Sequence, residues 1–288
     1  MQDPITTPQQ ELFGPEITGA AERSLLDQLL DDSRLYRTGT DFQGLLDFVA
    51  RLRNFAPFNA MLLQLQKPGL SYAASARDWR ERFGRYPKED ARPLLILWPF
   101  GPVALVYDVL DTDGSPLPQG VLHFTANGPI VDARFYQFEM LLKKKGVNIG
   151  WVDEGDLQAG RISVVRRATN DKELTNYALK INRNHGAAAK FVTLCHELAH
   201  LTLGHLGADK KIRIPDRSNL KHAEEELEAE SVAYLVCARN DIQSDSQKYL
   251  ASYVSDNTSV ANLDIYQIMR AAGQVETLLG LGAHSKFD

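Results

Sequence analysis

The sequence of 288 residues predicts an α+β fold in two parts. Apolar residues recur at three- and four-residue spacing through the first quarter of the chain, and continuous apolar runs typical of strands follow. A turn-rich stretch within residues 111–130 marks the expected boundary. The predicted parts are a flexible leader at residues 1–19, a mixed helical and strand N-terminal domain at 20–120, and an α+β C-terminal domain at 121–288.

The N-terminal elements follow from periodicity and from helix-breaking residues. Helical spacing of apolar residues predicts helices within residues 20–32, 41–55, 56–69 and 75–84. Pro57 suits the first turn of the third helix, and Pro68-Gly69 ends it. Strand-like apolar runs then occupy residues 92–100 and 102–110.

The C-terminal elements are read in the same way. Helical spacing returns in residues 132–146. Apolar runs predict strands at residues 160–168 and 176–184, just before an apolar helix at 191–203. Two further helices are predicted within residues 221–240 and 262–282.

The segment FVTLCHELAHLTLGH, residues 191–205, holds three of the chain's seven histidines. His196, Glu197 and His200 form the pattern H-E-x-x-H. Positions four apart share one face of a helix, so the two imidazoles can reach one point, with Glu197 turned aside but still near it. Such groups on an apolar helix are costly to bury unless something binds them. We therefore predict a Zn²⁺ site held by His196 and His200, with Glu197 acting on water.

A catalytic zinc site usually has a third protein ligand and an open position. His205 does not suit this role, because it lies five residues after His200 and, on a continued helix, on the opposite side from His196. A histidine at the end of a helix, near the negative pole of the helix dipole, is the better interpretation.

The acidic segment HAEEELEAESVAYL, residues 222–235, supplies other candidates for this ligand. Glu226 and Glu230 lie one turn apart within a stripe of alanines, whose small size would let another helix approach. We predict Glu226 as the third ligand, with Glu230 accepting a hydrogen bond from a ligand histidine. Glu225 or Glu230 as the ligand stays the alternative, and Glu228 fits a solvated acidic face.

Composition and charge exclude several classes of protein. Hydrophobic residues make up 44% and charged residues 24%, which is ordinary for a globular protein, and no apolar run reaches the roughly 18 residues of a membrane helix. Cys195 and Cys237 are too few for a disulfide framework and are interpreted as core residues. Because the N-terminus does not have the pattern of a signal peptide, we expect a cytoplasmic protein that binds no membrane.

Residues 51–92 are locally basic. They contain nine Lys or Arg and four Asp or Glu, in a chain whose net charge is −5. Aromatic residues among such cations are typical of single-stranded nucleic-acid binding. The candidate contacts are Arg77, Trp79, Arg80 and Arg85. The competing interpretation places Trp79 and Phe83 in the core, with the arginines facing solvent.

These residues carry a resemblance to a known family. CHELAHLTLGH followed by EEELEAESVAYLV resembles the ImmA/IrrE-type metallopeptidases, and the second segment is similar to their ArdC-like antirestriction branch. The order of N-terminal features is also similar to an ArdC N-terminal domain: Phe58-Asn59, Pro68-Gly69, Trp79, Gly84 and a strand beginning at Arg92. The resemblance covers most of residues 45–240. It implies a zincin-like metallopeptidase C-terminal domain behind a mixed helical and strand N-terminal domain.

The resemblance also implies a function. It points to a zinc metallopeptidase acting on a specific protein, such as a regulator or DNA-associated protein in stress response, phage defence or antirestriction. Glu197 would take a proton from water and give it to the leaving amine. His222, Tyr234 and a more distant residue are the candidates for stabilising the oxyanion, and the strand at 176–184 could pair with an extended substrate. The alternative is an ArdC-like, single-stranded DNA-binding antirestriction protein whose metal site is structural or secondary.

Overall fold

Helices and short strands alternate along the chain. The computed structural model describes residues 39–70, 72–98, 101–116, 130–153, 159–170, 172–242 and 263–281. The helices are α2 (Gly39–Arg51), α3 (Pro57–Gln66), α4 (Ala76–Phe83), the short 3-10 helix η2 (Val109–Asp111), α5 (Asp132–Lys143), α6 (Ala187–Leu203), α7 (His222–Arg239) and α9 (Ile265–Leu278). The strands are β1 (Ala73–Ala74), β2 (Arg85–Pro87), β3 (Leu94–Trp98), β4 (Gly101–Asp108), β5 (Thr112–Gly114), β6 (Val147–Val152), β7 (Gly160–Arg166) and β8 (Asn176–Asn182). The predicted α+β class is confirmed.

Two small antiparallel sheets follow α2 and α3 in the chain. β4 pairs with both β1 and β3, and β2 pairs with β5. Helix α4 begins at Ser75, whose hydroxyl accepts a hydrogen bond from a backbone N–H of the first turn, and ends at Gly84 in a left-handed conformation. It buries Trp79 against Tyr72 and Phe83. Strands β1, β2 and β5 have no counterpart in the prediction, because two or three residues show no readable alternation.

The larger sheet, β6-β8-β7, packs against α6, which carries the H-E-x-x-H motif. β8 is the central strand, parallel to β6 and antiparallel to β7. Tyr177, Leu179 and Ile181 alternate along β8 and are fully buried in the core shared with α5 and α6, as a sheet covered on one face requires. β6 has no counterpart in the prediction, although Val147, Ile149 and Trp151 alternate with Asn148 and Gly150 as in a strand with one buried face.

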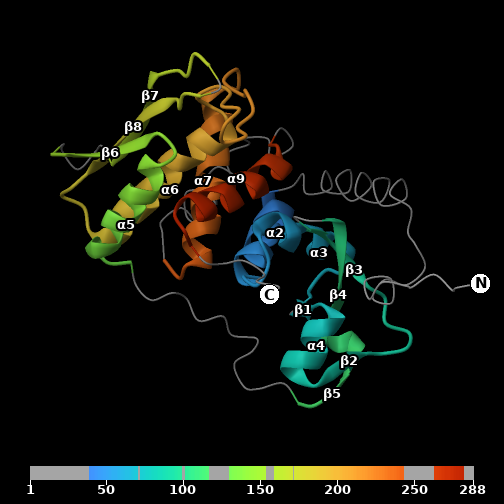
Figure 1. Cartoon of the computed structure of the whole chain (residues 1–288). Coiled ribbons are helices and arrows are strands. Elements are labelled where there is room, and N and C mark those ends of the chain that lie inside the picture. Colours follow the sequence, from blue (N-terminus) through green and yellow to red (C-terminus); the bar gives the residue numbers. More distant parts are fainter. Residues whose placement is uncertain are drawn as a thin grey trace, which may run out of the picture.

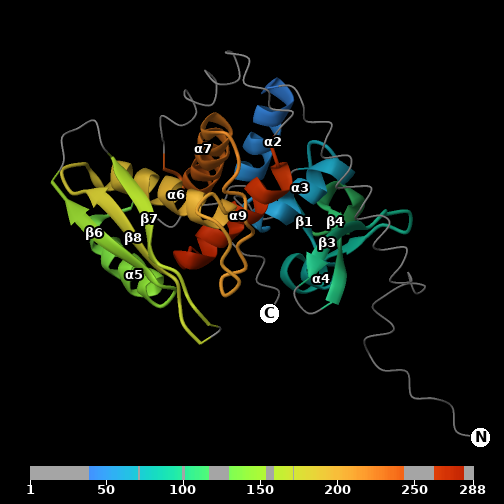
Figure 2. The ribbon, with the colours of Figure 1, turned by 90° about the horizontal axis from the view of Figure 1, so that it is seen from above.

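Helices α6, α7 and α9 lie between this sheet and the N-terminal elements (Figures 1 and 2). Helices α2 and α3 pack against α7 and α9, and buried residues of both parts form one hydrophobic core. Arg239, at the end of α7, is buried and donates hydrogen bonds to the carbonyls of Val49 and Phe55. The division into domains near residue 120 stays a prediction. The residues of α2 and α3 belong to the same hydrophobic core as α7 and α9.

The other predicted elements are observed with small shifts of their ends. The metal-bearing helix predicted at residues 191–203 forms the larger part of α6. The leader at 1–19 and the helix predicted within 20–32 lie outside the described residues. None of the helices in the described ranges combines the length and the apolar character needed to cross a bilayer.

Candidate metal centre

Helix α6 carries the two histidines of the motif and ends just after the second. Gly204 follows it at a φ of 87°, which strains any other residue, and a Cβ there would lie 2.2 Å from the carbonyl oxygen of Pro215. The N–H of Gly204 donates to the carbonyls of His200 and Leu201, which closes the last turn of the helix. The chain therefore leaves the helix within one turn of His200, and His205 folds back toward it.

Side-chain atoms from α6 and α7 meet at one point. Nε2 of His196 and Nε2 of His200 are 3.2 Å apart, and each lies 3.4 Å from an oxygen of Glu226. One donor atom from each of the three residues lies within 4.8 Å of the others, and all three side chains are half-buried. Two imidazole nitrogens and a carboxylate oxygen suit zinc and similar divalent ions. The residues present therefore fit a metal centre of the predicted kind.

Glu197 lies beside these donors in a cleft of about 770 Å³, which we call the metal cleft, between α6, α7 and β7. Burial raises the pKa of Glu197 above its ordinary value, although a hydrogen bond from the backbone of Ile162 in β7 acts in the opposite direction. Gly160 allows β7 to come this close, because a Cβ there would lie 2.5 Å from Cγ2 of Thr193 on α6. The backbone of β7 thus forms one wall of the metal cleft.

The two histidines have opposite electrostatic surroundings. Burial acts to lower the pKa of His196, but hydrogen bonds with Glu226 and Glu230 outweigh it and raise the pKa to about 10. Burial, followed by the neighbouring His196, lowers the pKa of His200 to about 3. The pKa of Glu226 is lowered chiefly by its hydrogen bond with His196. Two carboxylates therefore surround the imidazoles with negative charge, which favours a bound cation.

Glu225, Glu226 and Glu230, the predicted alternatives for the third ligand, lie at different positions relative to the two histidines. Glu230 lies behind His196, with Oε2 at 3.1 Å from Nδ1, which is the hydrogen-bonding position predicted for it. Glu225 lines the metal cleft, but within the described chain Glu226 is the glutamate whose oxygens approach Nε2 of both histidines. The geometry thus favours Glu226 as the ligand.

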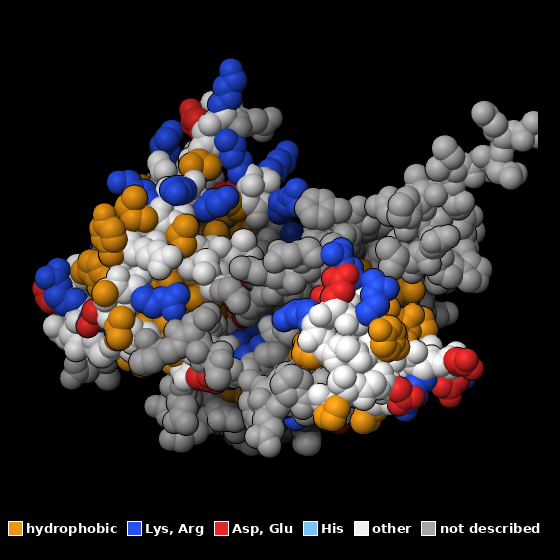
Figure 3. Space-filling model, turned by 60° about the horizontal axis from the view of Figure 1, so that its bottom comes forward, with side chains coloured by type: hydrophobic (Ala, Val, Ile, Leu, Met, Phe, Trp, Pro, Cys, Tyr) orange, Lys and Arg blue, Asp and Glu red, His pale blue; other side chains and the backbone are white. Residues whose placement is uncertain are grey.

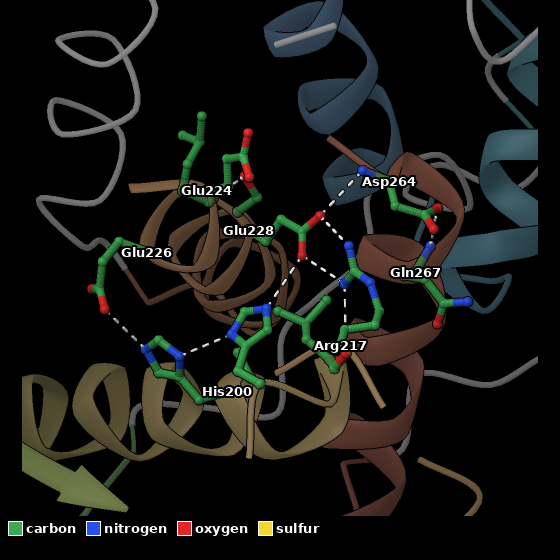
Figure 4. A network of polar contacts seen from close by, with 12 residues as sticks. His200, Arg217, Glu224, Glu226, Glu228, Asp264 and Gln267 are labelled. Atoms are coloured by element: carbon green, nitrogen blue, oxygen red, sulfur yellow. Dashed lines mark hydrogen bonds and ion pairs between the residues drawn. The ribbon is translucent and has the colours of Figure 1, made fainter. Parts of the chain in front are cut away.

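A second set of polar side chains lies behind His200 (Figure 4). Nδ1 of His205 is 3.0 Å from Nδ1 of His200, and its Nε2 is 3.3 Å from Oε2 of Glu228. Glu228 is 1% exposed and accepts hydrogen bonds from Nη1 and Nη2 of Arg217, each at 2.6 Å. His205 lies just after the end of α6 and outside the donor group, as predicted, and it contacts His200 because the helix ends at Leu203. The prediction for Glu228 was wrong, because its side chain is buried rather than solvated.

The candidates for stabilising the oxyanion are also separated. His222 lines the metal cleft, with Nδ1 at 3.7 Å from Glu226. Tyr234 instead donates a hydrogen bond to Asp47 of α2 and is not part of the cleft wall, so its proposed role in the reaction was wrong.

The predicted substrate-binding strand needs a correction as well. β8 is hydrogen-bonded on both sides, to β6 and to β7, and has no edge to offer a substrate. The strand at the edge of the sheet that lines the metal cleft is β7. The sequence could not distinguish the two strands, because strand order depends on pairings between distant segments.

Two of the predicted nucleic-acid contacts have structural roles. Trp79 is 0% exposed, and its Nε1 donates a hydrogen bond of 2.9 Å to the carbonyl of Tyr107. The prediction that it stacks on a base was therefore wrong. Arg85 donates hydrogen bonds to the hydroxyl of Thr112 and to the carbonyl of Ser115, which hold β2 to the β5 segment.

The other two predicted contacts, Arg77 and Arg80, are exposed on α4. Both lie next to Glu81, with Arg77 Nε at 3.0 Å from the carboxylate. On the face shown in Figure 3, basic and acidic side chains lie next to one another at the end of the molecule that holds α4. Contact of Arg77 and Arg80 with nucleic acid stays a prediction.

The two cysteines are both buried and free, as predicted for core residues. Burial, followed by hydrogen bonding with Cys237, raises the pKa of the Cys195 thiol well above its ordinary value. A thiol of raised pKa is a poor nucleophile, and neither cysteine is among the residues that line the metal cleft.

Comparison with known proteins supports the metal centre. Residues 180–274 match the MPTase-PolyVal family, described as a zincin-like metallopeptidase. This segment contains α6, α7 and most of α9, so the predicted zincin-like domain is confirmed. The family implies a metal ion, and the donors on α6 and α7 fit one. No curated protein matches the chain significantly.

The solved structures that are similar to the chain include a metal-free and a Mn(II)-bound structure of the antirestriction ArdC protein from the R388 plasmid. The metal-free structure is 18% identical, with a TM-score of 0.35, and the match covers 79% of this chain and 83% of that one. The Mn(II)-bound structure is 19% identical, with a TM-score of 0.36, and the match covers 86% of this chain and 99% of that one. These structures belong to the branch that the sequence resembles, but the likeness is too low to carry a function across.

Proposed function

We propose that this chain is a zinc-dependent metallopeptidase that hydrolyses a specific protein. The proposal rests on one observation: the donor atoms of His196, His200 and Glu226 converge in the same cleft that holds the carboxyl group of Glu197. A zinc ion held by these three residues would supply a Lewis acid that lowers the pKa of water and polarises a carbonyl group.

Glu197 is the proposed general base. It does not belong to the three-residue donor group, yet it lies in the same cleft, within reach of a water molecule at that point. Its raised pKa makes the carboxylate a better proton acceptor, and the same group can then deliver the proton to the leaving amine. The N–H of Ile162 orients the carboxylate from the side of β7.

We propose that β7 holds the substrate in an extended form. The N–H of Asn182 donates to the carbonyl of Ala159, so these two residues form a hydrogen-bonded pair of the ladder. Hydrogen-bonded and non-hydrogen-bonded pairs alternate along antiparallel strands, and the backbone groups of residues 160, 162 and 164 therefore point away from β8. The N–H of Ile162 is donated to Glu197, so an extended peptide in the metal cleft can pair as an added strand with the backbone groups of Gly160 and Val164 on either side of it. His222, whose side chain is 85% exposed, is the proposed partner of the oxyanion.

The proposed substrate is a particular regulator or DNA-associated protein, and this part rests on the resemblance of the sequence to the ImmA/IrrE-type metallopeptidases. A strand-adding cleft recognises the backbone of any extended segment, so selection must come from side chains and from an accessible site in the partner. Absence of activity on an unstructured protein such as casein would therefore leave the proposal standing.

The test compares wild type with Glu197→Gln, and with Glu224→Gln as the matched control. Glu224 belongs to the first turn of α7 and does not line the metal cleft. Each protein is co-expressed with the products of neighbouring genes, and new N-termini are read by mass spectrometry. Glu197→Gln should keep its metal and its fold but produce no new termini, whereas Glu224→Gln should match wild type. Unchanged cleavage by Glu197→Gln would refute the proposed base.

Single-stranded DNA binding by the N-terminal part is the competing hypothesis. Burial of Trp79 and the hydrogen bonds of Arg85 leave Arg77 and Arg80 as its candidate contacts. If Glu197→Gln keeps full biological activity while loss of these two arginines removes it, DNA binding becomes the function and the metal site becomes secondary.

A further inference from the structure

His200 is connected to a row of buried polar side chains on the side away from the metal cleft (Figure 4). His205 follows the Gly204 turn, and its imidazole lies between Nδ1 of His200 and the carboxylate of Glu228. The side chains of His205 and Glu228 are 2% and 1% exposed. Neither residue lines the metal cleft, so neither contacts a substrate there.

Glu228 is itself held on two sides. Arg217 donates two parallel hydrogen bonds to it, and the backbone N–H of Asp264, just before α9, donates a third at 3.1 Å. The guanidinium of Arg217 always carries its charge, and its two bonds of 2.6 Å, one to each oxygen, together with the N–H of Asp264 require an ionised carboxylate that accepts all three. An ionised carboxylate has no proton to donate, so the group facing it must be the donor.

The direction of each hydrogen bond in this row then follows. Nε2 of His205 carries a hydrogen and donates to Glu228, which leaves Nδ1 of a neutral His205 as an acceptor. Nδ1 of His200 must therefore carry the hydrogen that it shares with His205. The remaining nitrogen of His200, Nε2, keeps its lone pair, and this is the atom that faces Glu226 and His196.

We propose that His205, Glu228 and Arg217 are positioning residues that hold His200 in the tautomer and orientation required for binding a metal through Nε2. This inference rests on the proposed metal site. It assigns a role to the histidine that the spacing excludes as a ligand. Most ligand histidines donate their second N–H directly to a carboxylate or a carbonyl. Here a histidine is placed between the ligand and the carboxylate.

The test measures metal binding rather than catalysis. His205→Leu removes both hydrogen bonds, whereas His205→Gln keeps an acceptor and a donor on one side chain. His185→Leu is the matched control, because His185 lies in the turn after β8, outside the row and outside the metal cleft. Zinc affinity is measured by competition with a chromophoric chelator, and the visible absorption of bound Co²⁺ reports ligand geometry. Thermal unfolding in the presence of EDTA shows whether each variant is folded.

We expect His205→Leu to weaken zinc binding by about 10- to 100-fold and to alter the Co²⁺ spectrum, as loss of a partner behind a metal ligand does elsewhere. His205→Gln should recover most of the affinity, and His185→Leu should match wild type. Equal affinity of wild type and His205→Leu would overturn the positioning role alone. A loss of equal size in both His205 variants would also overturn it, because it would indicate a purely structural role. Absence of metal binding by wild type would overturn the proposed function and the positioning role with it.

Discussion

Replacement of Arg239 by Met should destabilise the whole molecule. Arg239 ends α7 and is fully buried, as is its partner Glu276 near the end of α9, with Nε to Oε1 at 2.6 Å. Its guanidinium also donates to the carbonyls of Val49 in α2 and Phe55 just before α3. The carbonyl of Val49 lies in the last turn of α2, where carbonyls have no partner within the helix, and the carbonyl of Phe55 lies in the connection before α3.

The size of the effect follows from what the substitution leaves behind. Met fills a similar volume but removes the guanidinium that pairs with the buried carboxylate of Glu276, and breaking a buried ion pair in this way costs about 3–5 kcal/mol. Each carbonyl that loses its donor destabilises the fold by roughly a further 1–3 kcal/mol, and by less where a water molecule can donate in place of Arg239. The double variant Arg239→Met/Glu276→Leu strands no charge, so it should recover roughly 2 kcal/mol or more relative to the single variant.

Urea unfolding followed by circular dichroism, with EDTA present so that metal binding adds nothing, measures these losses. Arg166→Met is the control, because Arg166 pairs with Glu173 at the exposed end of β7 and should cost less than about 1 kcal/mol. We expect a single transition for wild type, since α2 and α3 share the core of α7 and α9. A loss below about 1 kcal/mol in Arg239→Met, or two separate transitions of which one is unaffected, would refute this reasoning.

Three further outcomes are expected. Purified wild type should contain about one zinc per chain and His196→Ala almost none, by elemental analysis, and equal metal content would count against the ligand set. Tyr234→Phe should lose about 1 kcal/mol of stability with its bond to Asp47 but cleave as wild type does, whereas His222→Ala should cleave more slowly at equal metal content. If α4 binds single-stranded DNA, Arg77→Gln/Arg80→Gln should weaken binding of a fluorescent oligonucleotide and flatten its salt dependence; unchanged binding would exclude these contacts.

The convergence of the candidate ligands could be predicted because helices impose their own geometry. A spacing of four places His196 and His200 on one face wherever the helix lies, and the alanine stripe identifies the face of α7 that approaches another helix. Glu226 and Glu230 lie on that face, and the structure places both against His196. These are local relations within single elements, and the sequence contains them directly.

The errors concern relations between elements. Nothing local distinguishes β8 from β7, because strand order is set by long-range pairing. The acidic segment predicts a solvated Glu228. The side chain is buried because it pairs with Arg217, which lies eleven residues earlier and outside the helix. His205 lies at the end of α6 as predicted, but its contact with His200 depends on the turn at Gly204, which the sequence pattern does not show. Charge and periodicity each fit two environments at these positions, and only the packing of distant segments decides between them.

Two buried contacts between α7 and the α9 segment, which we call clamps, explain how the fold can hold the candidate ligands in place. Glu228, near the start of α7, is bound to the N–H of Asp264 before α9, and Arg239, at its end, is bound to Glu276 near the end of α9. The helices must therefore run parallel, with clamps about 16 Å apart along α7 and about 18 Å apart along α9. Glu226 lies within one turn of the first clamp, and the same carboxylate of Glu228 reaches His200 through His205. Because one buried group fixes both helices that carry ligands, α6 and α7 cannot shift past each other without breaking it, and the donor atoms of the metal centre are held close together by the protein itself.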